Sequence, residues 1–193
     1  MASYDYSGFV STFTTPGRAG TGGQKIFSIY NGAADVSPAV VSVSKVSVSM
    51  YATVIKAVTM APPIIRLWKV TVAPGAGDLV TKVVDNTEGE SADSLVVCRQ
   101  DASANVTSSA SALTATLPAG TFIKSIPAPR IITAVGVDAP QVVDFGLGKP
   151  MKLRNNEGLV VFLDYTDAGS NPITDMWTVN CEFSHSLASG VLL

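Results

Sequence analysis

The stretch Trp177-Thr178-Val179-Asn180-Cys181-Glu182-Phe183 alternates between apolar and polar side chains along its whole length. Alternation with a period of two is typical of a β-strand that has one face in a core and the other toward solvent. No long stretch of the chain shows the 3.6-residue periodicity of an amphipathic helix, and valine, serine and threonine dominate. These features predict an all-β protein.

A second alternating stretch, Val40–Val54, changes phase part-way along. Val41 and Val43 lie on one phase, and Val46, Val48 and Met50 lie on the opposite phase. Without an inserted residue, such a shift would turn half of the strand's apolar side chains to solvent. The sequence therefore predicts a β-bulge at Ser44-Lys45.

Further apolar and β-branched stretches alternate with turns rich in Gly, Pro, Asn and Asp. They predict strands at residues 25–30, 64–72, 79–84, 95–99, 122–126, 131–137, 142–147, 151–153 and 159–163. The last of these is apolar on both phases, which indicates a strand covered on both faces. About eight to ten short strands at even spacing are typical of a sandwich or barrel. We expect a single-domain antiparallel β-sandwich that is jelly-roll-like.

The chain divides into an extended N-terminal arm (1–24), a β-sandwich domain (25–185) and a C-terminal tail (186–193). The arm ends in a glycine-rich joint, Gly17–Gly23. Its aromatic side chains can pack on their own domain or anchor on a neighbour, since aromatic residues dominate interface hot spots. The residues predicted to bind neighbours are Tyr4, Tyr6, Phe9 and Phe13 in the arm, and Val191, Leu192 and Leu193 in the tail.

The composition is poor in charge for a water-exposed protein. Only 15% of the 193 residues are charged, 47% are hydrophobic and the mean hydropathy is +0.34; an average soluble domain has about 25% charged residues. The longest uncharged run, Ala102–Ile123, contains Pro118 and many Ser and Thr residues, so no membrane span is expected. Lys and Arg are scattered and the net charge is −2, which argues against nucleic acid as a partner. The low charge instead indicates a surface covered by protein partners.

Candidate catalytic and metal-binding residues are few. The single histidine, His185, follows the last predicted strand and is expected at the surface or in an interface. One histidine with two separated cysteines cannot supply a zinc site, and Cys98 and Cys181 are expected to be buried free thiols.

The acidic residues also lack the spacing of a catalytic or calcium site. The segment Asp164–Asn171 lacks the distal glutamate of a calcium loop and is interpreted as a hairpin turn. Asp85, Glu88 and Glu90 share one hydrophilic loop, where solvated side chains are expected rather than paired glycosidase acids. The glycine-rich joint has no Gly-Lys-Ser/Thr ending of a phosphate-binding loop. We therefore expect neither enzymatic activity nor a metal or other cofactor.

The C-terminal third resembles a family of small virion structural proteins of tailed bacteriophages. The matching residues are Met151-Lys152-Leu153-Arg154-Asn155-Asn156-Glu157-Gly158-Leu159-Val160-Val161, then Trp177 to Phe183, and upstream Phe27-Ser28-Ile29-Tyr30-Asn31-Gly32-Ala33. This resemblance covers about a third of the chain and its motifs are structural. The glycine-tethered arm and the apolar tail depart from the family pattern.

The resemblance implies a β-sandwich protein of the phage head, assembled in the host cytoplasm. Its most direct implication is a capsid decoration (cement) protein that bridges capsomers of the major capsid protein. The alternatives are a head-fibre, tail or adaptor component, and a carbohydrate-binding module of a fibre. A homo-oligomer is expected, with a trimer favoured by the threefold sites of a capsid. Trp68, Phe162 and Trp177 are expected to hold the core.

Overall fold

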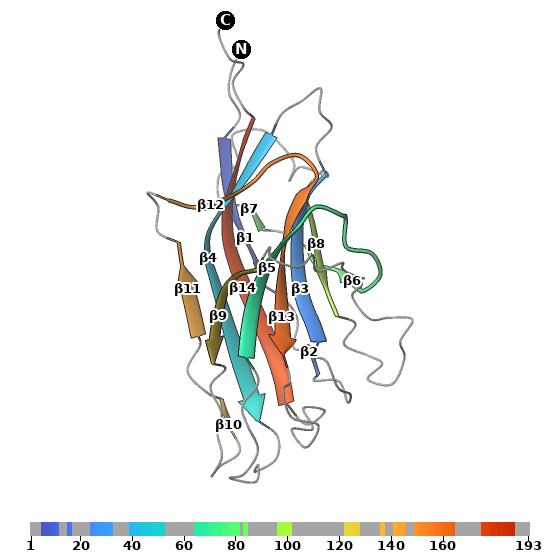
Figure 1. Cartoon of the computed structure of the whole chain (residues 1–193), viewed down its shortest axis with the longest axis vertical. Helices are drawn as coiled ribbons and strands as arrows, with labels where there is room; N and C mark the ends of the chain where they lie inside the picture. The colour runs from blue at the N-terminus through green and yellow to red at the C-terminus, as the bar shows by residue number, and fades with distance from the viewer. Residues whose placement is uncertain are drawn as a thin grey trace, which may run out of the picture.

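The computed structural model describes residues 5–11, 15–16, 24–32, 39–52, 64–81, 83–84, 96–101, 122–127, 136–137, 141–145, 149–164 and 175–187. Within these ranges the chain forms β-strands in two packed antiparallel sheets and no helix (Figure 1). The prediction of an all-β sandwich is confirmed. Its jelly-roll character stays a prediction.

Sheet A contains the two longest strands side by side. Its main order is β10 (Gly136–Val137), β4 (Ala39–Ala52), β14 (Asp175–Leu187), β1 (Asp5–Ser11) and β7 (Val83–Val84). Two further strands, β11 (Gln141–Asp144) and β12 (Met151–Leu153), pair with β4, and β2 (Thr15–Pro16) pairs with β14. Sheet B has the order β6 (Asp78–Leu79), β8 (Val96–Gln100), β3 (Gln24–Asn31), β13 (Glu157–Asp164), β5 (Ile64–Val70) and β9 (Phe122–Pro127).

The bulge predicted in β4 is confirmed by its pairing with β14. Glu182 pairs with Lys45, but the next residue, Phe183, pairs with Val43, so Ser44 is the inserted residue. The hydroxyl of Ser44 donates a hydrogen bond to the carbonyl oxygen of Glu182 at 3.2 Å. Because of this one-residue step, the valines on both sides of the bulge remain in the core.

Part of the predicted arm is a strand inside sheet A. Residues 5–11 form β1, which pairs with β14 along its whole length and with β7 on its other side. The strand satisfies backbone groups that the edge of β14 would otherwise leave open. The sheet therefore starts before residue 25. Asp5 pairs with Ser186, so the chain enters β1 and leaves β14 at the same end of the sheet.

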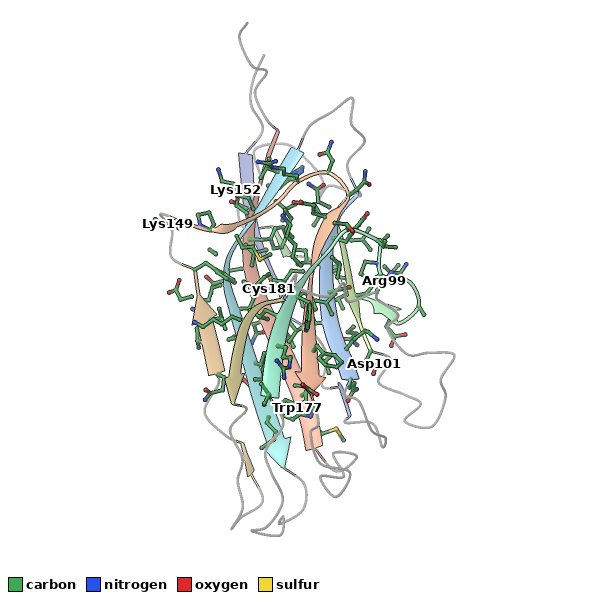
Figure 2. The ribbon with its side chains drawn as sticks, viewed as in Figure 1. Arg99, Asp101, Lys149, Lys152, Trp177 and Cys181 are labelled. Carbon is green, nitrogen blue, oxygen red and sulfur yellow. The ribbon has the colours of Figure 1, made fainter. Side chains whose placement is uncertain are left out.

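The core lies between the sheets and includes Trp177, which is 0% exposed. Figure 2 labels Trp177 and Cys181 along β14. The expectation that Trp68 and Phe162 belong to this core is wrong, because both are only partly buried on the outer face of sheet B. The core positions of β5 are Ile65 and Leu67, and Trp68 shares its phase with a charged neighbour, Arg66.

The strand predicted at 79–84 is two short strands in different sheets. Residues 78–79 form β6 in sheet B, and residues 83–84 form β7 in sheet A. The chain crosses between the sheets in the intervening residues, after the backbone N–H of Val80 donates to the carbonyl of Cys98 at 3.0 Å. Alternation of apolar residues alone does not reveal such a crossing, because both short strands follow the same period.

The family-like motif forms a corner between the sheets. It leaves β12 in sheet A and enters β13 in sheet B through a turn at residues 154–157, where Asn156 adopts a positive φ of 61°. The N–H of Glu157 donates to the carbonyl of Arg154 at 3.0 Å. Asn31 of β3 secures the corner: its side-chain amide donates to the carbonyl of Leu153 at 3.1 Å, and its own carbonyl accepts from the N–H of Asn156 at 2.8 Å.

Candidate interaction surface

The two sheets differ in how far the chain covers their outer faces. On sheet B, the outer positions Ser28, Val70 and Val160 are 0–1% exposed. On sheet A, the outer residues Asn180, Glu182 and Ser184 of β14 are exposed, and Thr178 is half-buried. Sheet A therefore offers the open face, and β4 and β14 make up its centre.

We name this centre the serine face, because small hydroxyl-bearing side chains dominate it. It consists of Ser42, Ser44, Lys45, Ser47 and Ser49 from β4, and Thr178, Asn180, Glu182 and Ser184 from β14. These residues alternate with the buried valines and aromatic residues of the same strands. Serine and threonine lose little side-chain entropy when a partner covers them, and their hydroxyl groups both donate and accept hydrogen bonds.

An ion pair lies near the middle of the serine face. The ammonium of Lys45 lies 3.1 Å from a carboxylate oxygen of Glu182, and these side chains are 39% and 55% exposed. An exposed pair of this kind contributes only about 0.2–1 kcal/mol to folding. The pair therefore matters more for what the face can meet than for the stability of the chain.

Neighbouring strands widen the open face on both sides. On one side, Val142 is opposite Ser47 and Asp144 is opposite Lys45, and both β11 residues are exposed. Val142 is 44% exposed, which makes it one of the few large apolar side chains at the surface of the described chain. Lys152 of β12 continues this side and lies beside Lys149 in Figure 2.

Two of the predicted partner-binding aromatic residues fall within β1. The register places Phe9 opposite Glu182 of the serine face, and Tyr6 opposite the buried His185. The other predicted residues, Tyr4, Phe13, Val191, Leu192 and Leu193, lie outside the described residues. Their role in binding neighbours stays a prediction.

His185 lies within the last strand rather than after it. It is part of β14 and is 3% exposed, so the expectation of a surface histidine is wrong. Its phase along the strand is that of Phe183 and Cys181, both of which are in the core. The alternation of buried positions at Cys181 and Phe183, extended by two residues, predicts a buried side chain at position 185.

No group of His, Cys, Asp and Glu side chains in the described ranges could hold a metal ion. Asp164, the first residue of the loop interpreted as a hairpin turn, accepts a hydrogen bond from Arg66 at 2.7 Å. Asp85, Glu88 and Glu90 lie outside the described residues.

The two cysteines are free and buried, as predicted. Burial raises the pKa of the Cys181 thiol well above its usual range, and the nearby Cys98 and Glu182 raise it further. A thiol with a raised pKa stays protonated at neutral pH and is a poor nucleophile.

A hollow of about 380 Å³ lies at the β6–β8 edge of sheet B, with Leu79, Val97 and Arg99 among its lining residues. The Arg99 guanidinium donates to the carbonyls of Ala76 and Gly77, both at 3.3 Å, and so holds the loop before β6. Figure 2 places Arg99 on the opposite side of the molecule from Lys149. The hollow has few polar groups: apart from this guanidinium and a threonine, its lining is apolar or sulfur-containing.

The outer face of sheet B also lacks an open aromatic platform in its described part. Trp68 and Phe162 are half-buried there, and Val160, between them in the sheet, is 0% exposed. A sugar-binding platform needs exposed rings, so this geometry weighs against the carbohydrate-binding alternative.

The sequence matches no protein-family model and no curated protein. The described part of the structure contains no helix that is long and apolar enough to cross a membrane. The functional interpretation therefore depends on the serine face. The sequence contains a signal for this face, because serines occupy the polar phase of residues 40–50 on both sides of the bulge. The valine pattern of the same residues predicts only the buried face.

Proposed function

We propose that this chain is a structural protein of a bacteriophage particle, a decoration (cement) protein that stabilises the head by bridging capsomers. The observation that carries the proposal is the serine face, a long, open and weakly charged sheet surface on a chain with only 15% charged residues. A surface of this kind is suited to cover by protein. The resemblance of the corner motif to phage virion proteins names the class of assembly.

The chemistry of a cement protein is that of a large contact surface. Separating two capsomers that the protein bridges exposes the surface buried between the protein and the capsomers. This exposure costs about 25 cal/mol for each Å² of apolar surface. Small side chains allow close approach of the partner, and hydroxyl groups pair with backbone and side-chain groups of either polarity. The rigid sandwich beneath keeps the surface preformed, which lowers the entropy cost of binding.

The experiment uses particles assembled with the shell protein of the genome that encodes this chain. Asn180→Arg places a long cation in the middle of the serine face, and because the side chain of Asn180 is exposed, we expect the fold to be unchanged. We expect heads assembled with this variant to lose the protein and to release DNA at a lower temperature. Lys124→Glu, an exposed position on β9 of sheet B, is the matched control and should leave occupancy unchanged.

The tail needs a separate variant. Replacing Val191, Leu192 and Leu193 with serine leaves β14 intact, because that strand ends at Leu187. Deleting residues 1–24 is unsuitable, since it would remove β1 from inside sheet A. The cement role is rejected if immunogold labelling finds the protein on tails alone, or if heads that lack it are as heat-stable as complete heads.

A further inference from the structure

We propose that the serine face binds the serine face of a second copy of this chain, in a twofold-symmetric dimer. The inference goes beyond the proposed function, because it concerns the isolated protein. Both contacts use the serine face, so this dimer must separate before the face meets a capsomer. It rests on the arrangement of charges and small side chains across β4 and β14.

In a twofold interface, every contact occurs twice: if residue i of one copy contacts residue j of the other, residue j of the first copy contacts residue i of the second. An axis that runs parallel to the strands, midway between β4 and β14, exchanges these two strands. Because Lys45 is registered directly opposite Glu182, this axis places Lys45 of one copy over Glu182 of the other, and the reverse. These four charges then alternate, and Asp144 of each copy lies beside its own Lys45 at the outer end of the same row.

The small residues match under the same axis. Ser42 faces Ser184, Ser47 faces Asn180, and Ser49 faces Thr178, because each of these pairs is registered within the chain. None of these side chains is long enough to keep two sheets at their usual face-to-face distance of about 10 Å, so the two serine faces can approach more closely. At that closer distance the hydroxyl and amide groups can pair across the interface.

The outer strands extend the contact. The axis brings β11 of one copy over β1 of the other, so Val142 lies over the backbone position of Ser11 and Asp144 over that of Phe9. Val142 is 44% exposed in the single chain. The most exposed apolar position beside the serine face would be covered in this dimer.

The area is that of a stable dimer. β4 has 14 residues and β14 has 13, and at about 3.4 Å per residue such strands are roughly 44 Å long. At about 4.8 Å spacing these two strands cover about 420 Å², and β1, β11 and β12, with 7, 4 and 3 residues, add about 230 Å². The total is about 650 Å² for each copy and about 1,300 Å² for the dimer, within the range of about 1,200–2,000 Å² that stable interfaces bury.

The test exchanges charges between two variants and measures mass by sedimentation velocity. Lys45→Glu leaves Glu182 and Asp144 without a cation in their row, and Glu182→Lys places a second cation beside Lys45. We expect wild type to sediment as a dimer, each variant alone to have at least a tenfold higher dissociation constant, and an equimolar mixture to form the heterodimer. Mixing cannot repair a folding defect within one chain, so recovery on mixing reports the contact between copies.

Lys124→Glu is the matched control for charge, and its dimer should have the wild-type dissociation constant. The proposal is overturned if wild type is monomeric at about 100 µM, which is about tenfold above the Kd of a weak dimer of about 10 µM. It is also overturned if wild type is a trimer, or if mixing the two variants forms no heterodimer. A heterodimer from a protein that never joins phage heads would uphold this inference and reject the cement role.

Discussion

Gly158, at the start of β13, has no room for a side chain. A Cβ at this position would lie 2.8 Å from Cδ2 of Tyr30, 2.9 Å from the carbonyl oxygen of Ile29 and 3.1 Å from Cγ2 of Val70. All three neighbours belong to the adjacent strands β3 and β5 of the same sheet, and one is a backbone oxygen, so they cannot move aside easily.

We therefore expect Gly158→Ala to lower the free energy of unfolding by about 1–3 kcal/mol. Urea denaturation followed by circular dichroism measures the change. Ser184→Ala, on the exposed face of sheet A, is the matched control and should change stability by less than about 0.5 kcal/mol. Equal effects from the two variants would contradict the close contact at Gly158.

Glu157 links the corner to β5 by charge. Burial raises the pKa of its carboxyl group, but the hydrogen bonds from Lys69 and from the N–H of Arg154, together with the charges of both residues, outweigh burial and leave the pKa below its ordinary value. The Lys69 ammonium lies 2.6 Å from the carboxylate. A carboxyl group whose pKa is lowered by folding stabilises the fold above its ordinary pKa, about 4.3, and this contribution disappears as the pH falls through the lower pKa of the folded state.

We expect Glu157→Gln to cost about 1–2 kcal/mol at pH 7, because it weakens two hydrogen bonds to a charged group. The difference from wild type should shrink as the pH is lowered below about 4. Chemical denaturation at a series of pH values measures it. A difference that stays constant down to acid pH would show that the charge of Glu157 plays no part.

The buried thiols give a third prediction. Cys98 and Cys181 are 2% and 0% exposed, and the raised pKa of Cys181 keeps it protonated. We expect neither to react with Ellman's reagent in the native protein at pH 8, and both to react at once in guanidinium chloride. Rapid reaction of one thiol equivalent without denaturant would contradict the burial of these residues.

At the scale of the elements, the bulge in β4 sets the register of the central strand pair. Ser44 is the inserted residue, so deleting it would leave Val43 and Val46 two positions apart on one face and make the strand pair regular. Deleting Ser47 instead would make Val46 and Val48 adjacent, so one half of the strand would turn its valines to solvent. We expect the Ser47 deletion to cost several kcal/mol or to prevent folding, as judged by circular dichroism and thermal unfolding, and the Ser44 deletion to cost much less. Ser44→Ala keeps the backbone and removes an exposed hydrogen bond, so it should cost less than about 1 kcal/mol. A Ser47 deletion as stable as the Ser44 deletion would contradict this register.

Most strands could be predicted from the sequence because local alternation determines them. Met151–Leu153 is observed with the predicted bounds, and the bulge was detectable from valine phase alone. Errors arose where a long-range choice decided the outcome. The pattern in β5 could not say which phase faces the core, since Trp68 and Leu67 are both apolar and only sheet packing selects Leu67.

The N-terminal segment shows the same limit. Its glycine-rich joint is the expected feature of a tethered arm, but whether the residues before it pair with β14 depends on an open strand edge elsewhere in the chain. The candidate surface was hidden for a related reason. Serines on one phase of a strand indicate a polar face, and only the covered outer face of sheet B shows that sheet A offers the open one.

For the molecule as a whole, the central claim is that the serine face is covered when the protein assembles. A cysteine at position 180 reports this cover directly, because the native cysteines are buried. Asn180→Cys is compared with Lys124→Cys on β9, and both positions are exposed in the single chain. The measurement is the rate of maleimide labelling in the dilute monomer and in the assembled state.

We predict that assembly slows labelling of Asn180→Cys at least tenfold and leaves Lys124→Cys unchanged. If Asn180→Cys is labelled as fast in the assembly as in the monomer, the serine face is not the contact surface and the account is wrong.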